Sequence, residues 1–190
     1  MIQSSSTTAI AQGMAYVQRV QRLAPEAGMV DVQQNLRDRT TIYTWIGQHI
    51  EAVNAVLQAY VAACHDCFHP RDRRTVQIVA IPLAASWGLD GICNLATQPI
   101  TLLVDVGRMT PSHWLSLVAH EYTHAHIAAP GHQPSFATAL AHLCLGLGLE
   151  PPPNQTEELL RRWPPYPQRL DALAFWRGEM GVLFGPSQNQ

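Results

Sequence analysis

Residues 118–136 read VAHEYTHAHIAAPGHQPSF and place four histidines and one glutamate within nineteen positions. Inside this stretch, His120, Glu121 and His124 form the pattern His-Glu-x-x-His. On an α-helix, side chains four positions apart differ by about 40° around the axis and by about 6 Å along it. Two imidazoles placed in this way can reach the same cation, so the spacing predicts a metal site on one face of a helix.

The residue types in this pattern suit zinc. Zinc binds imidazole nitrogens at about 2.0–2.1 Å, and a catalytic zinc site keeps one position open for water. Glu121 lies about 100° around the helix from His120, where its carboxylate flanks the metal instead of binding it. A carboxylate there can accept a proton from the attacking water, whose pKa zinc lowers to about 7, and can pass a proton to the leaving amine. Glu121 is therefore the predicted general base.

A catalytic zinc usually has three protein ligands, so one more is expected. His132 follows His124 by eight positions and comes just after the Pro130–Gly131 helix break. A turn there brings the chain back over the metal, which makes His132 the preferred third ligand. The alternative is a glutamate from a later helix, either Glu157 or Glu158. The sequence leaves both arrangements open.

Helical periodicity dominates both ends of the chain. Apolar spacing and proline breaks predict helices over residues 8–22, 40–64, 110–129, 135–147, 155–163 and 168–180. The helix with the histidine motif has a clear start, because Thr110 can cap it and Pro111 occupies the first helical position, where a missing N–H costs nothing. Its apolar residues Trp114, Val118, Tyr122 and Ala125 lie roughly opposite His120 and are expected to face the core.

The middle of the chain predicts strands. Residues 75–84 and 99–107 are rich in β-branched side chains, and the segment 92–96 (ICNLA) between them is a short third candidate. Turn signals separate the three stretches, so we expect a small antiparallel sheet. Helices, then a sheet, then helices is the order of an α+β fold.

A length of 190 residues predicts a single domain, 1–190. We expect it to comprise a helical N-terminal part (1–70), a core with the sheet and the histidine motif (75–147), short C-terminal helices (151–180) and a loose tail (185–190). The N-terminal segment lacks the basic and apolar regions of a signal peptide, and the most apolar run, 137–149, is too short to cross a bilayer. We therefore expect a cytoplasmic protein that is not attached to a membrane.

Three stretches together resemble the SprT-like zinc metalloprotease domain, a minimal zincin: GICNLATQPITLLVDVG (91–107), LVAHEYTHA (117–125) and GHQPSF (131–136). The resemblance covers less than half of the chain. It implies a strand before the active-site helix, zinc ligands at His120, His124 and His132, and Glu121 as general base. It also implies a packing role for Phe136. One departure is Gln133, because the family usually has glycine at this position. The change alters the loop.

Peptide binding follows by analogy. The strand around Ile100–Val106 is expected to form the sheet edge beside the cleft, where an extended peptide can pair with it and place its scissile carbonyl at the zinc. The partner is then a protein or peptide substrate. The net charge of −2 and the short basic clusters give no clear nucleic-acid signature, and the oligomeric state is left open.

A second cluster, Cys64, Cys67 and His69, has ligand-like spacing. A lone Cys-x-x-Cys without a second pair is weak support for a structural zinc, and cysteines that pack as small apolar groups at a helix end are the simpler interpretation. The sequence therefore predicts a zinc-dependent metallopeptidase. The alternative is a zinc-binding, catalytically inactive protease-like scaffold that binds a protein partner. Retention of Glu121 favours the enzyme.

Overall fold

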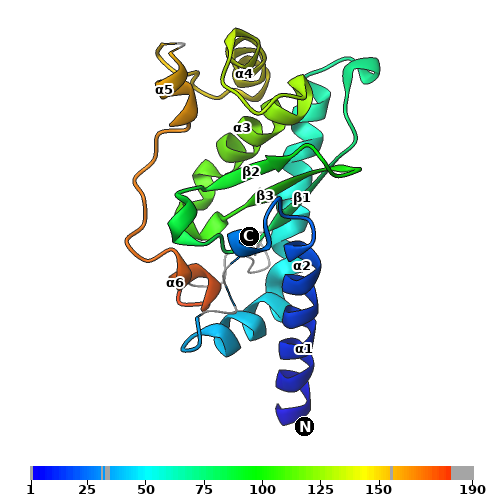
Figure 1. Ribbon diagram of the computed structural model, residues 1–190, viewed down its shortest axis with the longest axis vertical. Helices are drawn as coiled ribbons and strands as arrows, with labels where there is room; N and C mark the ends of the chain where they lie inside the picture. The colour runs from blue at the N-terminus through cyan, green and yellow to red at the C-terminus, as the bar shows by residue number, and fades with distance from the viewer. Residues whose placement is uncertain (1, 31, 33–34, 155, 181–190) are drawn as a thin grey trace, which may run out of the picture.

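The computed structural model describes residues 2–30, 32, 35–154 and 156–180 (Figure 1). Its main elements are α1 (Ile2–Gln21), α2 (Arg39–Asp66), β1 (Val76–Ala80), β2 (Gly91–Asn94), β3 (Ile100–Val104), α3 (Trp114–Ile127), α4 (Pro134–Leu147), α5 (Glu157–Arg161) and α6 (Leu173–Trp176). The predicted α+β class is confirmed, because N-terminal helices precede a three-stranded sheet on which α3 packs. The predicted loose tail, 185–190, lies outside the described residues.

The sheet is mixed, so the predicted antiparallel arrangement is wrong for one of its strand pairs. The strand order is β1-β3-β2, with β3 antiparallel to β2 and parallel to β1. The cause is the connection 81–90, which joins β1 to β2 but leaves room for one strand between them. β3 then fills the position between the two earlier strands. Turn residues in the sequence mark where strands end, but they do not reveal that a connection skips a neighbour.

The prediction that Ile100–Val106 forms a free sheet edge is also wrong. β3 lies between β1 and β2, and all five of its residues are buried. A run of five apolar or β-branched residues without alternation suits a central strand that is covered on both faces. In the described part of the chain, β2 pairs with β3 alone and leaves its other edge open.

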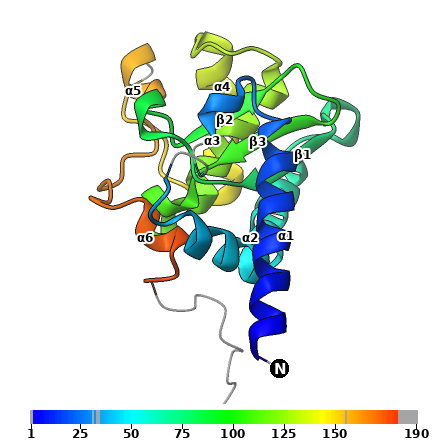
Figure 2. The same ribbon diagram turned by 60° about the horizontal axis from the view of Figure 1, so that its bottom comes forward.

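The two N-terminal helices are packed unusually closely. A β-carbon added at Gly13 of α1 would lie 1.9 Å from the backbone oxygen of Tyr43, and one added at Gly47 of α2 would lie 1.9 Å from that of Ala9. The glycines thus let each helix backbone touch the other, and α1 runs along α2 in both views (Figures 1 and 2). α2 also contacts β1 and α3, so it supports the sheet and the histidine-bearing helix together.

A buried carboxylate ties the C-terminal segment to the sheet. Asp105, at the end of β3, accepts hydrogen bonds from the indole nitrogen of Trp176 at 2.8 Å and from the guanidinium of Arg108 at 3.0 Å. The backbone N–H groups of Leu83 and Gly107 also donate to it. Four donors from three segments of the chain satisfy this carboxylate, which is why a charge can be buried there. Trp176 belongs to α6, so this contact fixes one end of the segment that follows α5.

Candidate metal centre

The helix that carries the motif begins as expected, although not with the predicted cap. Pro111 starts a 3-10 turn, Pro111–His113, that leads into α3. The Thr110 hydroxyl does not bind a backbone N–H of this turn; it contacts the Ser112 hydroxyl and His113 Nδ1, each at 2.8 Å. The predicted apolar face is buried and comprises Trp114, Val118, Tyr122 and Ala125. With this face in the core, the opposite face presents the motif histidines to a cavity.

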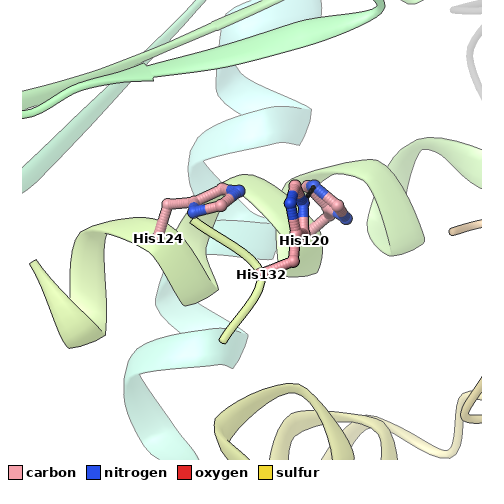
Figure 3. A group of neighbouring side chains, drawn as sticks. All are labelled: His120, His124 and His132. Carbon is pink, nitrogen blue, oxygen red and sulfur yellow. Dashed lines mark hydrogen bonds between the residues drawn. The ribbon is translucent and has the colours of Figure 1, made fainter. Parts of the chain in front are cut away.

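Three imidazoles converge at one point (Figure 3). His120 and His124 come from α3, and His132 comes from the loop between α3 and α4. Their candidate ligand nitrogens all lie within 4.8 Å of one another, and the Nε2 atoms of His120 and His132 are 3.2 Å apart. Two nitrogens on one tetrahedral zinc ion are about 3.3 Å apart, given a zinc–nitrogen distance of about 2.05 Å. The spacing of this pair therefore fits zinc, and the three histidines together could hold a metal ion.

The surroundings keep these imidazoles in the form that binds metal. His124 Nδ1 donates a hydrogen bond to the Ala129 carbonyl at 3.0 Å, which leaves the lone pair of Nε2 free. This carbonyl is within reach because the chain turns after α3 at Ala128, whose φ of 53° is left-handed. Burial lowers the pKa of His124 to about 4 and lowers that of His120 well below its ordinary value. Neutral imidazole is the ligating form, so both residues are prepared for a cation.

Phe136 supports all three rings. Its ring centroid lies 5.1 Å from that of His120, 4.5 Å from that of His124 and 4.6 Å from that of His132. The side chain is fully buried in α4. It restricts the imidazole orientations without competing for the metal, since it carries no polar atom. This placement agrees with the packing role that the resemblance implies.

Glu121 is a buried carboxylate that points toward the edge strand. Its side chain is 5% exposed, and a β-carbon added at Gly91 of β2 would lie 2.8 Å from Glu121 Oε1. Glycine at position 91 therefore leaves the space that Glu121 occupies. Burial raises the pKa of Glu121 to about 8, and the negative charge of Asp90 adds to the effect. A pKa near neutrality is suited to a group that exchanges protons.

This shift predicts a pH effect on the stability of the metal-free protein. The pKa of Glu121 rises from 4.5 to about 8 on folding, so its favourable contribution is complete below about pH 4.5 and is lost as the pH rises through 8. Glutamine cannot ionise, so the Glu121→Gln variant does not lose this stability as the pH rises. Urea unfolding with a chelator, at pH 5, 6.5 and 8, should show the variant becoming several kcal/mol more stable relative to wild type as the pH rises. Parallel pH profiles for the two proteins would contradict the burial of an ionisable Glu121.

The three histidines open into one cavity of about 920 Å³. Its floor is α3, with His120, Glu121 and His124, and His132 borders the same space. One wall consists of residues 87–93, which include most of β2, and the other consists of residues 161–166 together with Gln168. In Figure 1 this second segment runs from α5 down to α6 along the side of the molecule.

The open edge of β2 presents backbone groups to this cavity. The Asp105 N–H donates to the Asp90 carbonyl at 2.8 Å, which makes these two residues a hydrogen-bonded pair of the antiparallel ladder. Because such pairs alternate, Ile92 and Asn94 also face β3, and the N–H and C=O groups of Gly91 and Cys93 face outward. Gly91 and Cys93 both line the cavity. The outward backbone N–H and C=O groups of these two residues thus lie in the same cavity as Glu121.

Asp90 is a residue of the cavity that the sequence interpretation did not single out. Tyr166 donates a hydrogen bond to Asp90, and the Arg108 guanidinium lies 3.6 Å from the same carboxylate. This contact joins the two walls. His113, two turns before His120, has its ring 5.7 Å from that of Tyr166. No local pattern marks Asp90 or Tyr166, because their meeting depends on a contact between segments 76 positions apart.

The structure separates the rival ligand candidates. Glu157 and Glu158 lie on α5, their side chains are largely exposed, and each pairs with an arginine one turn later. Neither joins the histidine cluster among the described residues. Cys64, Cys67 and His69 likewise form no second group of this kind in the described part of the chain. Cys64 is fully buried at the end of α2, in keeping with an apolar packing role.

None of the helices in the described ranges combines the length and the apolar character that a membrane crossing requires. Comparisons of the chain with protein-family models, with curated proteins and with solved structures found no match. The resemblance to SprT-like proteases therefore depends on the motif residues alone. What the structure establishes is a possible metal site: a buried helix with two histidines one turn apart, a third histidine beside them, and a buried glutamate nearby.

Proposed function

We propose that this protein is a zinc-dependent metallopeptidase of the cytoplasm. The observation that carries the proposal is the convergence of His120, His124 and His132 in one cavity with the Glu121 carboxylate. A bound zinc ion would supply Lewis acidity for the scissile carbonyl and would make water a stronger nucleophile near neutral pH. The three imidazoles would hold the ion, and their shared support on Phe136 keeps them aligned.

Glu121 moves the proton in this proposal. As carboxylate it accepts a proton from the attacking water, and as carboxylic acid it donates a proton to the leaving amine. Its position one residue from a histidine ligand brings it to the same cavity, and Gly91 leaves room for it. A metal site with a purely structural role does not need this carboxylate. Burying the carboxylate costs desolvation free energy, which favours a chemical role for it.

The substrate in this proposal is an extended peptide that lies along β2. The outward N–H and C=O groups of Gly91 and Cys93 can pair with its backbone as a further strand. The pairing places the peptide between β2 and the 161–168 segment, above the histidines. In this proposal β2, which is free to pair along its outer edge, takes the role that the sequence had assigned to Ile100–Val106.

Gly91→Ala should separate the position of Glu121 from metal binding. The added β-carbon would lie within 3.0 Å of three Glu121 atoms, so the carboxylate must move. Misplacing a catalytic group by about 1 Å can cost about 100-fold in rate. We expect kcat/KM to fall by about 10- to 100-fold while zinc content stays unchanged, as measured by peptide hydrolysis and elemental analysis. Full activity in this variant would show that Glu121 does not need its observed position.

The proposal is tested by zinc content together with casein or peptide cleavage. We expect purified wild-type protein to bind zinc and to cleave, and a chelator to abolish cleavage until zinc is restored. Zinc binding without cleavage of casein or of a broad peptide library would instead favour the inactive scaffold. Absence of zinc from both the purified and the zinc-incubated protein would reject both.

A further inference from the structure

We infer that Arg161 and Arg162 make this cavity selective for peptides with an acidic side chain near the scissile bond. The inference depends on the proposed function, because it assigns the substrate class of the same site. Both arginines stand at the end of α5, on the wall that faces the peptide-binding edge of β2.

These two arginines are the exposed charges of the cavity lining. The other charged side chains that line it, apart from the histidines, are Asp90 and Glu121. Asp90 is already engaged by Tyr166 and Arg108, and Glu121 is buried. An incoming peptide therefore meets two exposed guanidinium groups on this wall.

Their present partners are easily exchanged. Arg161 pairs with Glu157 at 3.5 Å and Arg162 pairs with Glu158 at 3.3 Å, each one helical turn away. All four side chains are about 70% exposed. Exposed pairs of this type are worth at most about 1 kcal/mol, so they do not hold the arginines against competition. A substrate carboxylate between the two walls is less hydrated and can accept paired hydrogen bonds from a guanidinium.

The arginines share their cavity with the histidine cluster. His120, His124 and His132 line the same space as Arg161 and Arg162. The scissile bond is proposed to lie at these histidines, so substrate side chains next to that bond enter the space that the two guanidinium groups border. A basic side chain at the same place in the substrate would be repelled by the arginines, and by the metal when it is bound.

Binding to zinc-loaded Glu121→Gln tests this inference without cleavage. The probes are fluorescein-labelled peptides that are identical except for Glu, Gln or Lys at the positions flanking the cleaved bond. We expect the Glu peptide to bind about five- to tenfold more tightly than the Gln peptide by anisotropy, and the difference to shrink in 0.5 M salt. Adding Arg161→Gln and Arg162→Gln should bring the ratio within about twofold, and Arg161→Glu with Arg162→Glu should favour the Lys peptide.

The matched control removes two other exposed arginines, Arg37→Gln and Arg39→Gln, at the start of α2. It changes the net charge by the same amount and should keep the preference for the Glu peptide. A Glu-to-Gln ratio that is near one in the parent, or that survives loss of Arg161 and Arg162, would overturn the inference. Failure of the proposed function has a different signature, namely a wild-type protein that binds zinc and these peptides but cleaves none of them.

Discussion

Replacing Glu121 by glutamine will lower kcat/KM for peptide cleavage by about 100- to 10,000-fold, the range that a positioned general acid–base contributes. Glutamine keeps the size and the hydrogen-bonding shape of the side chain but cannot take up a proton. The buried position against β2 accepts it, because the neutral form is already favoured there. Steady-state kinetics on a fluorogenic peptide, with zinc measured in the same samples, checks the expectation.

The matched control is Glu51→Gln, which makes the same chemical change at an exposed position on α2. It should leave both kcat/KM and zinc content as in wild type. Zinc retention by Glu121→Gln is essential to the interpretation, since loss of the metal would also abolish cleavage. Undiminished cleavage in a zinc-loaded Glu121→Gln protein would remove Glu121 from the mechanism.

Replacing Gly47 or Gly13 by alanine will cost about 3 kcal/mol or more in the free energy of unfolding. Helix propensity alone predicts the opposite sign, because alanine in a helix interior is favoured over glycine by about 1 kcal/mol. Here the added β-carbon would lie 1.9 Å from a backbone oxygen of the facing helix. Backbone cannot rotate away as a side chain can, so α1 and α2 must separate and lose packing along their length. Urea denaturation of the variants measures the loss.

Gly28→Ala serves as the control for this pair. A β-carbon at Gly28 meets nothing within 4 Å, so we expect its effect to stay within about 0.5 kcal/mol. If Gly47→Ala or Gly13→Ala is instead as stable as wild type, the close crossing of α1 and α2 is not the packing of the protein in solution. A Gly47→Ala or Gly13→Ala variant that cannot be purified as a folded protein would also agree with the predicted loss of stability.

The sequence predicted the histidine helix well because its signals are local. Pro111 marks its start and Pro130 its end, and the spacing of His120 and His124 depends only on helix geometry. His132 could be anticipated for a similar reason, since a helix break eight residues after His124 turns the chain back toward the same face. Metal binding at this site, and the identity of the metal, stay predictions.

Features that depend on distant segments could not be predicted. The parallel pairing of β1 with β3 follows from a connection that skips a strand position, and it decides that β2 is the edge. The cavity wall formed by residues 161–168 arises from the contact between Tyr166 and Asp90 and from the anchoring of Trp176 on Asp105. The need for glycine at position 91 also could not be predicted, because it arises from the contact between β2 and the Glu121 side chain.

Anomalous diffraction at the zinc absorption edge can show whether three imidazoles hold one zinc ion. We predict one peak per chain, with the nitrogens of His120, His124 and His132 at about 2.0–2.1 Å from it. The peak should vanish in His132→Ala crystals and persist in Glu158→Gln crystals. A crystal grown with zinc that shows no peak at this cluster, or a peak bound by Glu157, Glu158 or the cysteines instead, would rule out a zinc site formed by the three histidines.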